Sequence, residues 1–133
     1  MPLHIRRGVL TDAAALAQFA ARTFADAFAA DNRPEDLQTH LVSSYGVMQQ
    51  SAELVDPNVV TLLAYRGAEL IAYAQVRRHR APACVAQDQA VELHRFYVDQ
   101  SAHGRGVAAE LMTAVHAAAR ALGGCHLWLG VWE

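Results

Sequence analysis

Near the C-terminus a strand, a glycine-containing loop, a helix and another strand follow one another, and this segment constrains the fold most. Val91–Val98 is rich in β-favouring side chains, and the loop Ser101–Gly106 follows it. The helix is predicted from an apolar face at helical spacing: Val107, Leu111, Val115, Ala118 and Leu122. Gly123 and Gly124 stop that helix, and His126–Trp132 predicts the last strand. A crossover of this kind is right-handed and joins parallel strands, so we predict an α/β protein.

The N-terminal part predicts a strand and two helices. His4–Arg7 alternates as a short strand, and Thr11 with Asp12 forms an N-cap signal before a helix from Ala13 to Ala30. Pro34 suits the first turn of a second helix, which reaches about Ala52. The predicted apolar faces are Leu16, Ala20, Phe24, Ala27 and Phe28 in the first helix, and Leu37, Leu41, Tyr45 and Met48 in the second.

The middle of the chain predicts an antiparallel hairpin. Its strands are Val59–Tyr65 and Glu69–Arg77, and Arg66, Gly67 and Ala68 join them. The predicted order of elements is therefore β-α-α-β-β-β-α-β. A chain of 133 residues with 53% hydrophobic residues fits one compact domain, which we expect to span residues 1–133.

Charge and hydropathy exclude several classes of function. A formal net charge of -2 gives no general attraction to phosphate backbones, so we expect no nucleic-acid partner. No apolar run reaches the roughly 18 residues of a membrane span, and the first residues do not resemble a secretory signal. We therefore expect no membrane association and a cytoplasmic location.

Neither the cysteines nor the histidines have the spacing of metal ligands. Cys84 and Cys125 lie far apart and form no CxxC pair, and no two histidines form an HxxxH pair. We therefore predict no disulfide framework and no metal site.

The loop before the long helix has the features of an anion site. Gly104 and Gly106 let the backbone come close to an oxygen, and the small Ala108 leaves room beside them. The unpaired N–H groups and the dipole at the start of a helix favour an anion such as a phosphate. An ordinary glycine-containing loop before a helix explains the two glycines equally well.

A dinucleotide-binding Rossmann unit is one interpretation of this loop. Gly104–Ala109 matches G-x-G-x-x-A, and Glu133 lies at the end of the next strand, as that unit requires. However, five residues separate Val98 from Gly104, and no third strand follows. Both features disfavour this interpretation.

The second interpretation is a resemblance to the GNAT N-acetyltransferase superfamily. The segment from His103 to Ala108, after a strand ending in Val98, resembles its acetyl-CoA motif Arg/Gln-x-x-Gly-x-Gly/Ala. The order of elements is also similar. Further segments resemble a bacterial branch that includes polyamine acetyltransferases: Thr23–Phe28, Asn32, Glu35–Leu37 and Glu92–Val98. The resemblance implies a GNAT-like mixed sheet and transfer of acetyl from acetyl-CoA to a primary amine of a small molecule or protein.

Two departures from the family pattern matter. His103 stands where the family usually has Arg or Gln, which implies weaker but retained binding of the pyrophosphate. Family members also continue past the strand with Trp128 and Trp132 into another helix and a hairpin, which commonly supply a tyrosine general acid. We therefore expect a domain truncated after its fifth strand, or a minimal member. A non-catalytic CoA-binding regulatory module is the alternative function.

The resemblance assigns roles in CoA binding mainly to backbone groups. Pantetheine is expected alongside Phe96–Val98, with the Phe96 N–H near the thioester carbonyl. The pyrophosphate is expected on the N–H groups of Gly104–Ala108, and Arg105 on a CoA phosphate. The full set of expected CoA-binding residues is Phe96, Tyr97, Val98, His103, Gly104, Arg105, Gly106, Val107 and Ala108.

Glu92 is the expected general base. It lies six residues before Val98 and aligns with the strand glutamate that serves as base in the histone-acetylating branch. Simple alternation places His94 on the same face as Glu92 and opposite Arg95, so His94 is a second candidate base. The alternative is that Glu92 is a surface or salt-bridged residue, with Arg95 as its partner.

Two further expectations concern partners. Asp26, Asp31, Glu35 and Asp36 cluster on the family's acceptor side, where they would attract a cationic amine or serve only as helix caps and surface charges. In the last strand, Leu127, Leu129 and Val131 share one face and Trp128 and Trp132 the other, as in a strand buried on both faces. An uncovered strand of this kind invites pairing, so we predict a homo-oligomer through this strand.

Overall fold

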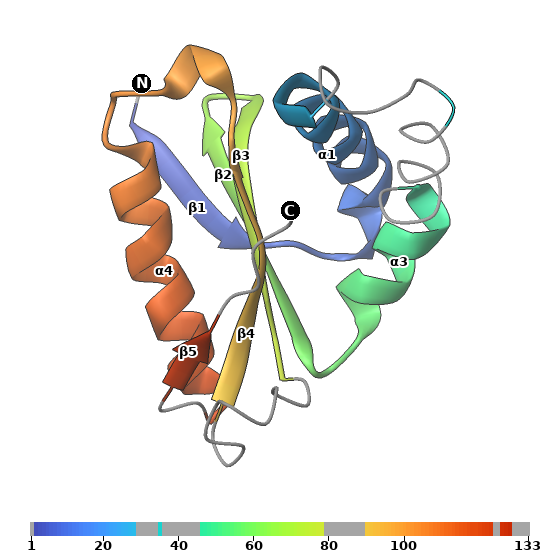
Figure 1. Cartoon of the computed structure of the whole chain (residues 1–133), viewed down its shortest axis with the longest axis vertical. Coiled ribbons are helices and arrows are strands. Elements are labelled where there is room, and N and C mark those ends of the chain that lie inside the picture. Colours follow the sequence, from blue (N-terminus) through green and yellow to red (C-terminus); the bar gives the residue numbers. More distant parts are fainter. Residues whose placement is uncertain (1, 29–34, 36–45, 79–89, 124–125, 129–133) are drawn as a thin grey trace. The chain divides into compact units, whose positions relative to one another are not determined.

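A computed structural model of the chain describes residues 2–28, 35, 46–78, 90–123 and 126–128 (Figure 1). The chain divides into two compact units. One is Val9–Val55, and the other combines Met1–Gly8 with Asp56–Glu133. Within the described residues, no helix combines the length and the apolar character that a membrane crossing needs.

The larger unit is built on a mixed sheet in which the strands lie side by side in chain order. The first four strands are antiparallel to their neighbours, and the last pair, β4 and β5, is parallel. This arrangement confirms the predicted α/β class and differs from the parallel sheet of a Rossmann unit. The strands are β1 (Leu3–Arg7), β2 (Val59–Arg66), β3 (Glu69–Arg77), β4 (Ala90–Val98) and β5 (His126–Trp128).

The helix α4 (Val107–Ala121) connects β4 to β5 and packs on one face of this sheet (Figure 1). Its predicted apolar face is confirmed, because all five residues of that face are buried in the core. Leu111 and Val115 are fully buried at its centre, against Leu62 and Ala74 of the hairpin, among others. Gly123 ends the helix region with a φ of +86°, as the predicted stop requires.

The predicted hairpin is confirmed. β2 and β3 pair antiparallel through the turn at Gly67 and Ala68, and Gly67 has a φ of +63°. Its register shifts by one residue between Ala64 and Tyr65, which leaves Ile71 as an extra residue in β3.

The smaller unit contains a 3-10 turn η1 (Leu10–Asp12) and the helices α1 (Ala13–Phe28) and α3 (Val47–Val55). Leu16, Ala20 and Phe24 are buried, as predicted, while the side chains of residues 27 and 28 lie outside the description. The predicted N-cap residues Thr11 and Asp12 lie in η1, directly before α1. The Asp12 Oδ2 accepts a 2.8 Å hydrogen bond from the Val9 N–H, which closes this turn.

The second predicted helix needs a correction. Most of it, including residues 34 and 36–45, lies outside the described residues. In its described part, α3, Met48 is 89% exposed, whereas Gln50 and Leu54 are buried. The reason is that the chain bends at Gly46 before α3 begins, so the helical phase predicted from Pro34 does not continue into α3.

Several predictions concern residues that the structure does not describe. The last strand is described only as far as Trp128, so the face of Leu129 and Val131 and the homo-oligomer predicted from it stay predictions. Cys84 and Cys125 also lie outside the described residues. The single domain over residues 1–133 and its truncation likewise stay predictions.

Candidate functional site

The strand β4 contains a bulge at His94. In the β3–β4 ladder, Arg77 pairs with Glu92 and Val76 with Leu93, and Gln75 then pairs with Arg95. His94 therefore has no opposite residue on β3 and is the extra residue of the bulge.

The bulge overturns the predicted faces of this strand. Gln75 and Arg77 are two residues apart on β3 and share a face, so their partners Arg95 and Glu92 also share a face. Simple alternation predicts the opposite, because it counts His94 as an ordinary strand residue. Glu92 and Arg95 thus lie on one side of the sheet, away from the α4 core.

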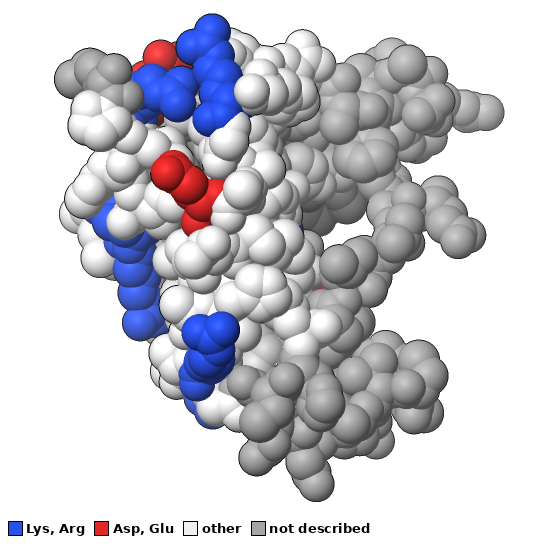
Figure 2. Space-filling model, turned by 90° about the vertical axis from the view of Figure 1, so that its left-hand side faces the viewer, with Lys and Arg blue, Asp and Glu red and all other residues white. Residues whose placement is uncertain are grey.

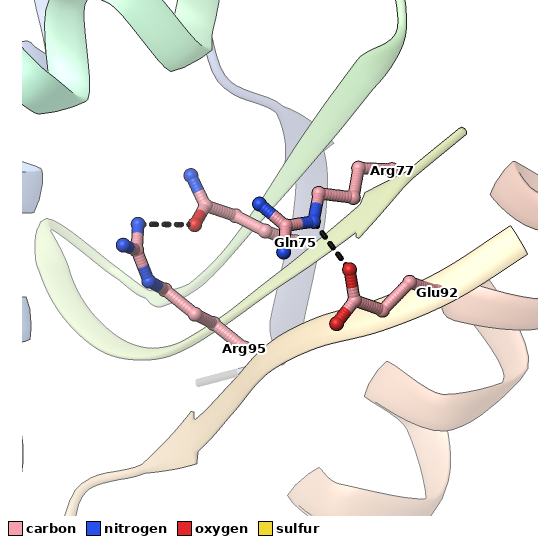
Figure 3. A network of polar contacts seen from close by, with 4 residues as sticks. All are labelled: Gln75, Arg77, Glu92 and Arg95. Carbon is pink, nitrogen blue, oxygen red and sulfur yellow. Dashed lines mark hydrogen bonds and ion pairs between the residues drawn. The ribbon is translucent and has the colours of Figure 1, made fainter. Parts of the chain in front are cut away.

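Three cross-strand pairs follow one another on this side of β3 and β4, and we call them the polar ladder. The rings of Tyr73 and Tyr97 stack with their centroids 5.6 Å apart. The Arg95 Nη1 donates a 2.7 Å hydrogen bond to the Gln75 Oε1 (Figure 3). The third pair is an ion pair between the Arg77 Nε and the Glu92 Oε1 (Figure 3).

The middle of the polar ladder extends to β2. The Gln75 Nε2 donates a 3.2 Å hydrogen bond to the Thr61 Oγ1, so one amide side chain connects β2 and β4. Thr61, Gln75 and Arg95 are all buried. Because buried polar groups are costly unless they are paired, these bonds fix the orientation of the Gln75 amide and of the Arg95 guanidinium.

Glu92, the expected base, is largely enclosed. Its side chain is 10% exposed and that of its partner Arg77 is 31% exposed. The expected alternative of a salt-bridged Glu92 thus applies, but the partner is Arg77 on β3 and not Arg95, because Arg95 faces Gln75. The second candidate base, His94, is half-buried at the bulge.

Thr61, Gln75 and Arg77 were not predicted from the sequence. A signal was present, because Thr61 and Gln75 are the polar residues within two otherwise apolar strand segments. Once the hairpin turn at Gly67 fixes the register, these two residues stand opposite each other. A pair of facing polar residues in a buried hairpin indicates a hydrogen bond.

The loop after β4 is held by its own hydrogen bonds. The Asp99 N–H donates to the Ile71 carbonyl at 2.8 Å, and the Ser101 Oγ donates to the Asp99 Oδ2 at 2.5 Å. Gln100–Ala102 forms a 3-10 turn, η3, which the Ala102 N–H closes on the Asp99 carbonyl at 2.9 Å. The loop therefore leaves the sheet in a defined direction.

The start of α4 has the geometry of an anion site. Gly104 and Gly106 both have a φ of +78°, which side chains other than glycine rarely adopt, and a Cβ at either position would meet nothing within 4 Å. The first helical bond runs from the Glu110 N–H to the Gly106 carbonyl, so the N–H groups of Val107–Ala109 precede the helical ladder. The two exposed glycines and the N–H groups at the start of the helix fit a diphosphate.

Charge is dispersed on the face that α4 presents. Figure 2 shows this face, on which arginine side chains form separate groups with uncharged surface and acidic side chains between them. Arg105, the expected phosphate contact, is exposed in the loop itself. Attraction of an anion to the start of α4 therefore depends chiefly on the backbone N–H groups and the helix dipole.

The end of β4 presents side chains to both faces of the sheet. Phe96 and Val98 pack against the α4 core, whereas Tyr97 belongs to the polar ladder. On the side of β5, the pairing that the structure describes runs only from Ala90 to Glu92 of β4. Within the described residues, the backbone of Phe96–Val98 therefore pairs with β3 alone.

Other expected site residues are less well defined. Glu35 is exposed, whereas Asp31, Asp36 and the side chain of Asp26 lie outside the description. In the part of the chain that the structure describes, no three His, Cys, Asp or Glu residues gather as metal ligands would.

Comparisons with known proteins agree with this arrangement. The sequence model of the acetyltransferase (GNAT) family matches residues 18–133. An uncharacterized N-acetyltransferase of Mycobacterium tuberculosis is 34% identical over 122 residues, which are 92% of this chain and 74% of that protein.

Solved structures show the same fold. The PaiA N-acetyltransferase of Thermoplasma acidophilum in complex with coenzyme A has a TM-score of 0.77 and 17% identity, over 92% of this chain and 75% of that one. An acetyltransferase of Clostridium acetobutylicum with acetyl-CoA has a TM-score of 0.76 and 15% identity, over 99% and 82%. The chain therefore belongs to the GNAT family of acetyltransferases, which confirms the prediction of an acetyl-CoA-dependent N-acetyltransferase.

Proposed function

We propose that the chain transfers the acetyl group of acetyl-CoA to a primary amine of a small molecule or a protein by direct attack of that amine. The observation that carries the proposal is the β4–loop–α4 unit, whose left-handed glycines and helix-start N–H groups suit a diphosphate. Membership of the GNAT family supports this use of the unit, and the related structure with coenzyme A supports the cosubstrate.

Backbone groups of this chain hold the cosubstrate in the proposal. The N–H groups from Gly104 to Ala108 bind the diphosphate, and Arg105 binds a further phosphate from the exposed side of the loop. The edge of Phe96–Val98 that β3 does not use binds the pantetheine arm. Bound acetyl-CoA supplies an activated acetyl thioester.

Glu92 is the proposed acceptor of the proton that the ammonium of the acceptor substrate must lose. It is a largely enclosed carboxylate on the strand whose end holds the pantetheine arm. The thioester is expected near the Phe96 N–H, four residues along β4 from Glu92. Four residues of strand span about 13 Å, so Glu92 acts on the amine through a chain of waters. The Arg77 guanidinium lies beside Glu92 and holds its Oε1 in a fixed position.

A release assay for the CoA thiol tests the proposal. The chain is incubated with acetyl-CoA and a panel of polyamines, amino acids, aminoglycosides and peptides. We expect amine-dependent thiol release with at least one class of acceptor and a loss of kcat of about 100- to 10,000-fold in Glu92→Gln. Glu69→Gln, at the exposed start of β3, is the matched control and should keep full activity.

Two results would contradict parts of the proposal separately. No thiol release with any acceptor would remove the transfer reaction. Turnover with the same rate and pH profile in Glu92→Gln as in the unaltered chain would remove only Glu92 from the mechanism.

The second candidate function is a CoA-binding module without catalysis. The ion pair between Arg77 and Glu92 favours it, because a structural ion pair between β3 and β4 accounts for the enclosed Glu92 without a catalytic role. A calorimetric titration of acetyl-CoA separates the two functions. Binding together with the absence of turnover for every acceptor class supports the module.

A further inference from the structure

The side chain of His103 folds back onto the strand that precedes its loop. Its Nε2 lies 2.9 Å from the carbonyl oxygen of Val98, the last residue of β4. A carbonyl oxygen only accepts hydrogen bonds, so the Nε2 must carry the proton. The geometry therefore selects one tautomer of the neutral ring, and protonation of Nδ1 leaves this bond in place.

The main chain of His103 is engaged as well. Its N–H donates a 3.2 Å hydrogen bond to the Gln100 carbonyl, which closes the η3 turn. His103 is thus tied to the loop by its backbone and to β4 by its ring. The next residue is Gly104, the first of the two left-handed glycines.

We propose that His103 is a positioning residue for the proposed CoA site, and that its Nε2–H latch to Val98 fixes the glycine loop relative to the end of β4. This inference rests on the proposed function. The latch fixes the backbone at the residue before Gly104, and glycine would otherwise allow many backbone conformations at that point.

The latch affects affinity through the free chain. A loop that is already in its binding conformation loses less conformational entropy when the ligand binds. If only a fraction of the molecules has this conformation, the apparent Kd equals the intrinsic Kd divided by that fraction. In this role the ring contributes a hydrogen-bond donor to the backbone, and neither its charge nor direct contact with phosphate is needed.

Substitutions at His103 test the role. His103→Ala removes the donor, whereas His103→Gln places an amide N–H at a similar reach. We expect the Kd for CoA to rise about 3- to 10-fold in His103→Ala, because one hydrogen bond is lost, and to stay within about 2-fold in His103→Gln. His116→Ala, an exposed histidine of α4, is the control and should leave the Kd unchanged.

Kinetics separate positioning from a general structural effect. We expect the KM for acetyl-CoA to rise in His103→Ala while kcat at saturating acetyl-CoA stays unchanged. S-acetylpantetheine lacks the diphosphate, so its KM should be the same in both chains. A uniform fall of kcat with both acetyl donors would overturn the inference.

A spectroscopic measurement tests the latch directly. Long-range proton–nitrogen NMR spectra distinguish the two neutral tautomers of a histidine ring, and the signal of His103 is assigned by its loss in His103→Gln. We expect the neutral ring to carry its proton on Nε2. A neutral ring that carries its only proton on Nδ1 contradicts the latch.

The outcomes also distinguish this inference from the proposed function. If the unaltered chain does not bind CoA, the proposed function fails and the inference fails with it. If the unaltered chain and His103→Ala bind CoA equally well, only the inference fails. If His103→Arg alone restores the affinity that His103→Ala loses, the side chain acts through its charge, and the positioning role is wrong.

Discussion

On one side of the β3–β4 pair, Val76, Leu93 and Phe96 pack into the apolar core beneath α4, whereas on the other side Gln75 and Arg95 belong to the polar ladder. The same two strands supply both sides, and both sides are largely buried. The apolar side is stabilised by close packing, which depends on volume and tolerates exchange between similar side chains. The polar side depends on pairs of defined geometry, because a buried polar group without its partner destabilises the fold.

This difference indicates which side of the sheet specifies the register between β3 and β4. Apolar side chains in a packed core can pack against more than one set of neighbours. The hydrogen bond between Arg95 and Gln75, however, forms only in the register in which His94 is the extra residue of the bulge. The polar ladder thus selects the register that the apolar side needs. Substitutions on each side separate the two contributions.

Leu111→Ala tests the apolar side at its centre. Leu111 is fully buried, and its truncation leaves a cavity that the α4 core cannot fill. We expect the free energy of unfolding to fall by about 3 to 4 kcal/mol. Urea denaturation measures the effect, with His116→Ala on the exposed face of α4 as the control. A loss of less than about 1 kcal/mol would mean that this side is loosely packed.

Arg95→Met tests the polar side. It removes the donor to the Gln75 Oε1 and keeps an unbranched side chain of comparable length. We expect a loss of about 1 to 3 kcal/mol in urea denaturation, because a buried acceptor loses its partner. The double variant with Gln75→Leu should lose clearly less than the two single losses added together. Additive losses would show that the two residues do not act as a pair.

Tyr97→Leu tests the stacked rings of the polar ladder. Tyr97 stacks on the buried Tyr73, and leucine retains apolar contact without the ring. We expect a loss of about 1 kcal/mol, the usual worth of an aromatic pair beyond its buried area. Tyr97→Phe should preserve most of the stability in the same denaturation experiment. If phenylalanine is as destabilising as leucine, the hydroxyl matters more than the stack.

The ion pair of Arg77 and Glu92 should contribute least to stability. Arg77 is partly exposed, so solvent screens the interaction and a double-mutant cycle should give a coupling energy of about 0.5 to 1 kcal/mol. The variants are Arg77→Met, Glu92→Gln and both together. The coupling should shrink in 1 M salt. A coupling energy that does not change in salt would show that this ion pair is shielded from solvent in the same way as the buried hydrogen bonds of Gln75.

Local patterns in the sequence predicted the hairpin, the limits of α4 and the loop glycines, because each depends on near neighbours. The turn at Gly67 brings two β-rich runs together, and Leu111 and Val115 lie on one helical stripe. Gly104 and Gly106 could also be recognised as positions of unusual backbone conformation, because glycine tolerates positive φ angles and both residues adopt them. These features need no knowledge of distant contacts.

Other features depend on contacts that one strand or helix does not reveal. The bulge at His94 results from the pairing of β4 with β3, so alternation along β4 alone misplaced Arg95. The partner of Glu92 is likewise set by that register. Met48 was misplaced because the bend at Gly46 resets the helical phase. The latch of His103 is a contact across a loop, and no periodic pattern predicts it.

The bulge also has a consequence for changes in chain length. If His94 is removed from the written sequence, Glu92, Leu93, Arg95 and Phe96 follow in plain alternation, each on the face that it occupies now. His94 is thus equivalent to a one-residue insertion that bends the strand without exchanging its faces. A relative that lacks this residue would keep the same core and the same ladder, but its glycine loop would leave the sheet in another direction.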